Sequence, residues 1–300
     1  MKILVTGGSG LVGRSLQNLV SNEWYFISTK DVNLLSYTDT VQYFSNINPD
    51  VIVHLAARVG GLFNNINNNE DMLVDNLTIN TNVIKAAEKC NTKRLILMLS
   101  TCIFPDKQLP LTEDMIHHGP PHYSNEGYAI AKRVLEVHAR LSKIETICLI
   151  PTNLFGPYDN FNLQDGHVIP ALIHKCYLSK QNFQISGSGN PLRQFLYNGD
   201  MAKIIKWAVE KKEVKNNHEL FICSSDEEIS IHDLAKMIAK IMNTTLENNN
   251  SDTKDDGQYR KTASNKLLKS AFTELQFSNF EEKLEETIKW FIKNYDYIRK

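Results

Sequence analysis

The chain has 300 residues, a length that favours two domains or one large α/β domain. Hydrophobic residues make up 42% and charged residues 22%, close to globular averages, so the composition excludes a wholly disordered chain. The 33 basic and 34 acidic side chains give a net charge of −1, which argues against a nucleic-acid-binding protein. No apolar run approaches the ~18 residues of a membrane-spanning helix, and the opening MKILVTGG lacks the pattern of a secretory signal.

The cysteines favour neither a disulfide scaffold nor a metal site. They are odd in number, widely spaced and never form C-x-x-C. A reducing, cytoplasmic compartment fits this usage best. The five residues are Cys90, Cys102, Cys148, Cys176 and Cys223.

The first half of the chain alternates short apolar runs with helical patterns. Strands are expected at residues 2–6, 24–28, 51–55, 94–99 and 146–150. Helices are expected between them at 11–20, 38–46, 72–89 and 126–141. Strands alternating with helices predict an α/β fold of the Rossmann type, with a doubly wound parallel sheet.

The regular alternation of strands and helices ends after Pro151. Beyond this residue the loops are longer and the amphipathic helices stand alone. Helices are expected at 167–178, 200–210, 231–242 and 280–297, with short strands at 183–185 and 220–222. We interpret this half as a smaller α/β substrate-binding domain. Residues 1–152 would mainly form the cofactor domain and 153–300 mainly the second domain, with some interleaving. Two Asn-rich segments, 64–71 and 243–256, are predicted to be exposed loops.

A glycine motif follows the first predicted strand directly. Gly7, Gly10 and Gly13 form G-x-x-G-x-x-G and lead into a helical pattern. Glycines at this place permit a tight turn and a close approach of the backbone to a pyrophosphate. The amides at the start of the helix then face the phosphates. The motif predicts a dinucleotide cofactor.

The end of the second predicted strand distinguishes the two nicotinamide cofactors. A carboxylate there suits the ribose 2′-OH of NAD, and a basic residue suits the 2′-phosphate of NADP. The sequence offers both, as Lys30 and Asp31. The two hydroxyl residues before Lys30 lead us to favour NADP(H), with NAD as the alternative.

Tyr128 and Lys132 stand four residues apart on a predicted helix and therefore share a face. A tyrosine with a pKa of ~10 needs ~4 kcal/mol of phenolate stabilisation to lose ~3 pKa units. An ammonium group in a partly dry site can supply this amount. Ser100 follows the predicted strand 94–99 at its carboxyl end, where ligands bind in open α/β sheets. Its hydroxyl could bond the same carbonyl oxygen that Tyr128 protonates.

These residues behind a glycine loop resemble the extended short-chain dehydrogenase/reductases. Further segments are similar to the GDP-L-fucose synthase family essentially from end to end. They are STCIFP at 100–105, HHGPPH at 117–122, PTNLFGP at 151–157, DGHVIP at 165–170, RQF at 193–195 and DGQYRKTAS at 256–264.

The resemblance implies an NADPH-dependent 3,5-epimerase and 4-reductase that converts GDP-4-keto-6-deoxy-mannose to GDP-L-fucose. Cys102 and His167 match the family's acid–base pair for moving protons at C3 and C5. Ser100 and Tyr128 would stabilise the enolate oxygen, and Tyr128 would then protonate the C4 oxygen. Lys132 would assist and hold the nicotinamide ribose.

The resemblance also implies the binding residues, with no metal ligand among them. The cofactor contacts would be Gly7, Gly10, Leu11, Val12, Gly13, Lys30, Asp31, Leu55, Ala56, Ala57, Leu99, Thr101, Lys132, Pro151, Asn153, Leu154 and His167. The substrate contacts would be Asn153, Lys175, Ser186, Arg193, Asp256 and Lys261. Ser186 stands where the family usually carries tryptophan, and its smaller side chain predicts a weaker grip on the substrate.

Other functions of the same fold fit the residues less well. A nucleotide-sugar 4,6-dehydratase would carry Asp and Glu where this chain has Thr101 and Cys102. A 4-epimerase that keeps its NAD would leave Cys102 and His167 without a task. A silent NADPH-binding module would not need Ser100, Tyr128 and Lys132 together.

Two further points follow from the resemblance. An enzyme for another 4-keto-deoxy nucleotide sugar, as in colitose formation, stays open, because the substrates differ by one hydroxyl. Helices 72–89 and 126–141 match the pair through which many superfamily members dimerise, so a homodimer is expected.

Overall fold

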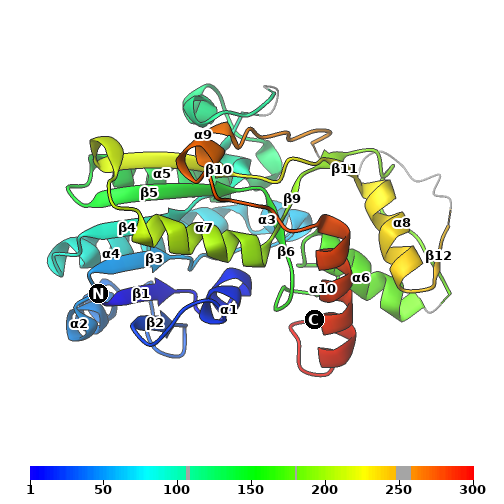
Figure 1. Cartoon of the computed structure of the whole chain (residues 1–300), viewed down its shortest axis with the longest axis horizontal. Helices are drawn as coiled ribbons and strands as arrows, with labels where there is room; N and C mark the ends of the chain where they lie inside the picture. Colours follow the sequence, from blue (N-terminus) through cyan, green and yellow to red (C-terminus); the bar gives the residue numbers. More distant parts are fainter. Residues whose placement is uncertain (106–108, 180, 248–257) are drawn as a thin grey trace.

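The centre of the molecule is a six-stranded parallel sheet (Figure 1). The computed structural model describes residues 1–105, 109–179, 181–247 and 258–300. The strand order is β10-β5-β4-β3-β1-β2, and every neighbouring pair is parallel. The predicted Rossmann-type sheet is thereby confirmed. The strands are β1 (Ile3–Thr6), β2 (Trp24–Ile27), β3 (Val51–His54), β4 (Arg94–Met98), β5 (Glu145–Pro151) and β10 (His218–Cys223).

Helices cover both faces of this sheet because its strands are apolar on both sides. In β1, Leu4 faces one buried cluster while Ile3 and Val5 face another. The first cluster packs against α2 (Tyr37–Ile47), α4 (Asn69–Lys89) and α5 (Glu126–Leu141). The second packs against α1 (Leu11–Gln17) and α7 (Asn198–Glu210). The sheet is therefore doubly wound.

A smaller unit packs beside the sheet (Figure 1). It is built around a third, aromatic-rich cluster that includes Phe155, Phe161 and Phe291. Its helices are α6 (Val168–Ser179), α8 (Ile231–Ile241) and α10 (Phe280–Asn294). Short strands pair as β6 (Asn153–Phe155) with β9 (Phe195–Tyr197), β7 (Asn182–Phe183) with β12 (Thr245–Leu246), and β8 (Leu192–Arg193) with β11 (Ile229–Ser230).

The remaining elements are short. They are α3 (Leu62–Asn67), α9 (Lys266–Ala271) and the 3-10 turns η1 (Thr101–Ile103), η2 (Glu113–His117), η3 (Tyr123–Asn125) and η4 (Lys215–Asn217).

The second half of the chain returns to the first sheet. The strand expected at 220–222 extends over His218–Cys223 as β10 and pairs with β5. Helix α7 also covers the sheet, beside α1. The predicted division near residue 152 stays a prediction, with these two elements as the interleaved part. In the described part of the chain, no helix is long and apolar enough to cross a membrane.

The first Asn-rich segment is helical, so the prediction of a loop at 64–71 was wrong. It forms most of α3 and the start of α4. The Asn68 side chain donates to the Asn64 carbonyl oxygen at 3.2 Å and to its amide oxygen at 2.6 Å. These local bonds satisfy groups that usually favour a turn. In the second segment, residues 245–246 lie in β12, and residues 248–256 lie outside the described part.

Candidate active site

The expected site residues of the cofactor half gather at one edge of the sheet. Parallel strands place their carboxyl ends together, and ligands of open α/β sheets bind there. Gly7 follows β1, Leu55 follows β3 and Ser100 lies two residues after β4. Pro151 ends β5, and Asn153 and Leu154 begin β6 just beyond it. The remaining predicted cofactor contacts at this edge are Leu11, Val12, Ala57, Leu99 and Thr101.

The glycine loop lets α1 approach the sheet closely. Gly7 has a φ of 71°, and a Cβ added there would lie 2.8 Å from the Ala56 amide nitrogen. A Cβ on Gly13 would lie 2.6 Å from the Gly7 carbonyl oxygen. Both positions therefore exclude a side chain for reasons internal to the protein.

Gly10 differs from its two neighbours in the motif. A Cβ on Gly10 would meet one heavy atom of the described residues within 4 Å, the Gly7 carbonyl oxygen at 3.3 Å. Gly10 is also the residue just before α1, and having no side chain it leaves the amides of the first turn uncapped. The space beside Gly10 and the amides of the first helical turn fit the pyrophosphate of a dinucleotide.

The turn after β2 favours NADP(H) over NAD. The Asp31 carboxylate accepts hydrogen bonds from the Ser28 amide and hydroxyl, both at 2.8 Å. These bonds lower the pKa of Asp31 and commit its Oδ2 to its own turn. Lys30 lies exposed in the same turn, at the place where a 2′-phosphate is bound in this fold.

Ser100, Cys102, Tyr128 and Lys132 form one cluster at the end of β4. The Ser100 hydroxyl oxygen accepts a hydrogen bond from the Cys102 amide at 3.4 Å. Lys132 Nζ donates to the Met98 carbonyl oxygen at 2.7 Å and lies 5.6 Å from the centroid of the Tyr128 ring. Lys132 and Cys102 are buried, whereas Ser100 and Tyr128 are half-buried and within reach of a ligand.

Burial pushes this cluster toward its neutral forms. Desolvation lowers the pKa of Lys132 to about 8, and desolvation together with the nearby Cys102 raises the pKa of Tyr128. The pKa of the tyrosine is thus raised, in contrast to the expected lowering by the lysine, because burial removes the hydration of the phenolate. Tyr128 therefore holds its proton, which is the form that a proton donor requires.

The charges of two lysines act on the Cys102 thiol. Burial raises the pKa of this thiol, while a hydrogen bond with Ser100 and the charges of Lys261 and Lys132 lower it. Lys261 acts on the thiol more strongly than Lys132 does. The segment around Lys261, far along the chain, thus lies near the catalytic edge of the sheet.

Residues 258–263 are fastened across the site by backbone and side-chain bonds. The Leu192 amide donates to the Tyr259 carbonyl oxygen at 2.9 Å, and Arg193 donates to the carbonyl oxygen of Gln258. The Ala263 amide donates to Gln194 Oε1 at 2.8 Å. The structure therefore brings Arg193 into contact with the segment that carries Lys261. The sequence analysis did not identify Gln194 as the residue that holds this segment in place.

The other predicted substrate residues are more dispersed. Asn153 donates to the Gln194 carbonyl oxygen at 2.9 Å. His167 is exposed just before α6, and Lys175 is half-buried about two helical turns later. Ser186 is exposed, and Asp256 lies outside the described residues.

A buried histidine that the sequence analysis did not select supports the glycine loop from beneath. His54 Nδ1 lies 2.8 Å from Thr6 Oγ1, and its Nε2 lies 3.1 Å from Asn80 Oδ1. Thr6 Oγ1 also accepts from the Ala56 amide at 3.2 Å. Desolvation lowers the pKa of His54 to about 3, so the ring is neutral. The chain of bonds ties β1, β3 and α4 together below the cofactor edge.

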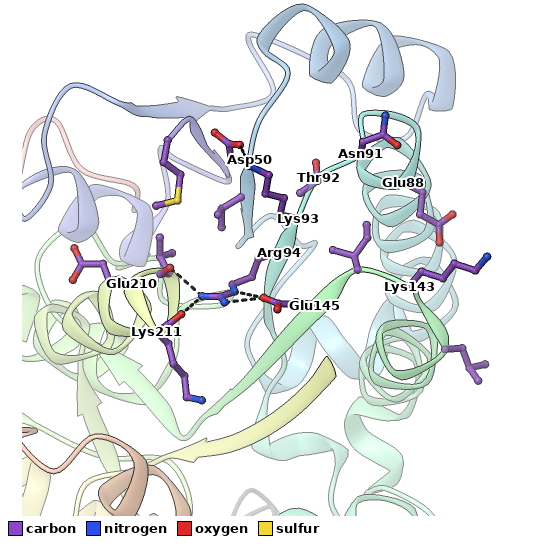
Figure 2. A pocket seen from close by; sticks show the side chains of 15 residues that line it. Asp50, Glu88, Asn91, Thr92, Lys93, Arg94, Lys143, Glu145, Glu210 and Lys211 are labelled. Carbon is purple, nitrogen blue, oxygen red and sulfur yellow. Dashed lines mark hydrogen bonds and ion pairs between the residues drawn. The ribbon is translucent and has the colours of Figure 1, made fainter. Parts of the chain in front are cut away.

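A hollow of about 1310 Å³ lies at the opposite end of the sheet, around the first residues of β3, β4 and β5 (Figure 2). Arg94 crosses it to Glu145 at 2.7 Å and to the Lys211 carbonyl oxygen. Lys93 pairs with Asp50 at 2.9 Å. These charges neutralise one another, and the hollow is separated from the Ser100 cluster by the length of the strands.

The fold and site are those of a nicotinamide-dependent oxidoreductase with a Rossmann-type sheet. Residues 3–223 match the model of the NAD dependent epimerase/dehydratase family. The chain belongs to this family.

Relatives that match over the full length of the chain point to a more specific group within this family. The chain is 45% identical to GDP-L-fucose synthase of Dictyostelium discoideum, over 99% of this chain and 97% of that protein. It is 40% identical to a probable GDP-L-fucose synthase of Drosophila melanogaster, over 100% and 99%. GDP-L-colitose synthase of Yersinia pseudotuberculosis is 33% identical, over 99% and 100%. The expected resemblance to the GDP-L-fucose synthases is confirmed.

A solved structure agrees with these relatives. The GDP-L-fucose synthetase of Naegleria fowleri, bound to NADP, superposes with a TM-score of 0.88. It is 35% identical, and the match covers 99% of this chain and 96% of that one.

The glycine loop yields a paired prediction. Gly10→Ala should leave the melting temperature nearly unchanged but weaken NADPH binding about tenfold, or ~1.4 kcal/mol, because its methyl group enters the phosphate space. Gly13→Ala should destabilise the fold by about 1–3 kcal/mol through overlap with the backbone. Thermal melts and NADPH fluorescence titration measure both effects. Unchanged NADPH affinity in Gly10→Ala would contradict the assigned phosphate position.

Proposed function

We propose that this chain converts GDP-4-keto-6-deoxy-D-mannose to GDP-L-fucose as an NADPH-dependent 3,5-epimerase and 4-reductase. The observation that carries the proposal is the gathering of Ser100, Cys102, Tyr128 and Lys132 at one strand edge, with Lys261 beside the thiol. A Ser–Tyr–Lys set serves reduction, and a cysteine near two cations serves proton transfer at carbon. The names of the full-length relatives agree with this combination.

In the reduction, NADPH supplies a hydride to C4 of the sugar when it is bound. The protein's task is to protonate and polarise the C4 oxygen. Tyr128 gives its proton to that oxygen, and the Ser100 hydroxyl donates a second hydrogen bond to it. Lys132, fixed by its bond to the Met98 carbonyl, compensates the negative charge that develops on Tyr128.

The cofactor would be held along the same strand edge. The glycine loop takes the pyrophosphate and Lys30 takes the 2′-phosphate. Residues at the ends of β3, β4 and β5 line the remaining part, and Lys132 holds the nicotinamide ribose.

In the epimerisation, each carbon beside the C4 ketone loses a proton and regains one on the other face. The electron pair of the broken C–H bond moves to the C4 oxygen as an enolate, which Ser100 and Tyr128 stabilise. An acid and a base are needed on opposite faces of the sugar. We assign these roles to Cys102 and His167. The positive charges of Lys261 and Lys132 favour the thiolate form of Cys102.

The substrate carries a diphosphate, which fixed cations must neutralise. We assign Arg193, Lys261 and Lys175 to this task, and Asn153 and Asp256 to polar contacts. Exposed Ser186 offers little apolar surface to the nucleotide sugar, in keeping with the predicted weaker grip.

Assembly and location are separate parts of the proposal. Helices α4 and α5 pack together and carry exposed apolar side chains, Val74, Val134 and Leu141. Such a surface suits a second copy of this chain. All five cysteines are free and buried, which suits a reducing cytoplasm.

The first test is turnover of the proposed substrate. Purified protein mixed with NADPH and GDP-4-keto-6-deoxy-mannose should oxidise NADPH and form GDP-L-fucose, identified by NMR. Faster turnover of a 4-keto-3,6-dideoxy nucleotide sugar would favour the colitose-type reaction of the 33% identical relative. The absence of oxidation with either sugar would contradict the proposal.

The two half-reactions should separate in one variant. Cys102→Ser should lower GDP-L-fucose formation at least about 100-fold, because a serine hydroxyl is a far weaker acid–base group than a thiol. NADPH oxidation should persist and yield an unepimerised 6-deoxy sugar. Cys148→Ser, a buried cysteine of β5, is the matched control for a thiol-to-hydroxyl change. Normal GDP-L-fucose output from Cys102→Ser would remove Cys102 from the reaction.

The expected dimer is checked by light scattering. The protein should have twice the 34.2 kDa mass of the chain, and Val134→Glu should shift it toward monomer by burying a charge. Tyr297→Glu, at a side chain that is 90% exposed near the C-terminus, should have no effect. A monomer at micromolar concentration would contradict the proposed interface.

A further inference from the structure

Asp159 is a buried carboxyl group for which the reaction has so far no use. The residue is only 4% exposed. Its Oδ1 accepts a hydrogen bond from the Asn160 amide at 2.7 Å, but its Oδ2 has no hydrogen-bond partner among the described residues. Burial raises the pKa of this carboxyl to about 6. A buried unpaired oxygen costs free energy, and its retention calls for a partner.

The backbone before Asp159 is held in an unusual conformation. Tyr158 has a φ of 73°, a region that bulky residues rarely adopt, and Gly156 has a φ of 146°. The Tyr158 ring packs at 4.9 Å on Trp290, and its carbonyl oxygen accepts from Arg299 at 2.9 Å. Contacts with the C-terminal region thus maintain a strained backbone, as is common at functional sites.

The loop from β6 to α6 folds back on itself, so that the residues next to Asp159 and His167 meet. The Gly166 amide donates to the Asn162 carbonyl oxygen at 2.9 Å. A Cβ on Gly166 would lie 2.6 Å from the Asn160 carbonyl oxygen, so the backbones next to Asp159 and His167 are in contact. The charge of His167 acts on the Asp159 carboxyl more strongly than that of Arg299, the other charged group facing it.

We propose that Asp159 is the positioning residue for His167, accepting the N–H of one imidazole nitrogen on Oδ2 while the other nitrogen faces the sugar. This inference rests on the role of His167 in the epimerisation proposed above. An exposed imidazole has two tautomers and can rotate. An acid–base catalyst needs a single tautomer in a single orientation. A carboxylate on the far nitrogen fixes both, and it stabilises the imidazolium that forms when the ring takes up a proton.

A double-mutant cycle tests this coupling. Asp159→Asn keeps the side-chain shape but loses the charge and should lower the kcat for GDP-L-fucose formation about 10-fold or more. The KM for the sugar nucleotide should stay the same, and the share of unepimerised reduced sugar should rise. In a His167→Asn background, Asp159→Asn should cause no further loss. Asp165→Asn, an exposed carboxylate of the same loop, should behave as the unsubstituted protein.

Each other outcome decides against the positioning role. Equal losses in both backgrounds would mean that Asp159 acts through the fold alone, as would a loss confined to the KM. Melting temperature and NADPH affinity show whether Asp159→Asn is folded.

A measurement on the unsubstituted protein covers the case of a misfolded variant. The protein is labelled with ¹⁵N-histidine and saturated with GDP and NADP, and the His167 resonance is assigned by its loss in His167→Asn. One fixed tautomer with a protected N–H is the expected result, and averaged tautomers would overturn the proposal. This readout needs no turnover, so it separates a failure of the Asp159–His167 bond from a failure of the proposed reaction.

Discussion

The close approach of α1 to the ends of β1 and β3 is the constraint on which the site depends. Gly7 and Gly13 let these backbones meet with no room for a side chain between them. The bond chain from Thr6 through His54 to Asn80 then links the same two strands to α4. The strand edge is thereby tied to its neighbours by the protein's own contacts, and such support from the scaffold is what precise placement of reacting groups requires.

The site has a rigid half and a loop half. Tyr128 and Lys132 lie on one helix, and Ser100 and Cys102 lie directly after a central strand, so the sheet fixes their spacing. Of the groups assigned to the sugar nucleotide, Asn153 and Arg193 lie on short strands and Lys175 lies on α6. Gln194 holds the segment of Lys261 by bonds to Ala263, and these contacts join positions far apart in the sequence. The Ser100 cluster thus resides on the sheet and its helix, whereas His167 and the segment of Lys261 lie on connecting segments outside it.

The alternation of strands and helices was sufficient to predict the sheet, because period and length are local properties of the sequence. The same local signals located Ser100, Tyr128 and Lys132 at the carboxyl edge. These local signals did not predict strand pairing between segments that lie far apart in the sequence. Strand β10 joins β5 across about seventy residues, and a three-residue apolar run says nothing of that pairing.

The spacing of residues in the sequence also did not reveal the surroundings of individual side chains in the folded protein. The Asn-rich segment read as a loop because its residues usually bond to their own backbone, yet in α3 those bonds support a helix. Asp159 stands between the segments 151–157 and 165–170 that the sequence analysis singled out, but in neither of them. Only the folded loop shows that its carboxyl is buried and that one of its oxygens has no partner among the described residues.

A single cause, the loss of hydration on burial, shifts the pKa values in this cluster in opposite directions for acids and for the lysine. Desolvation favours the neutral form of every buried group, so it lowers the pKa of Lys132 and raises those of Tyr128 and Cys102. The tyrosine and the thiol therefore hold protons, which suits donors, while a base must be created against this tendency. In the proposed reaction the cations beside Cys102 perform that function. In that proposal Lys261 has two tasks, because the cation assigned to the substrate diphosphate is also one whose charge lowers the pKa of the Cys102 thiol.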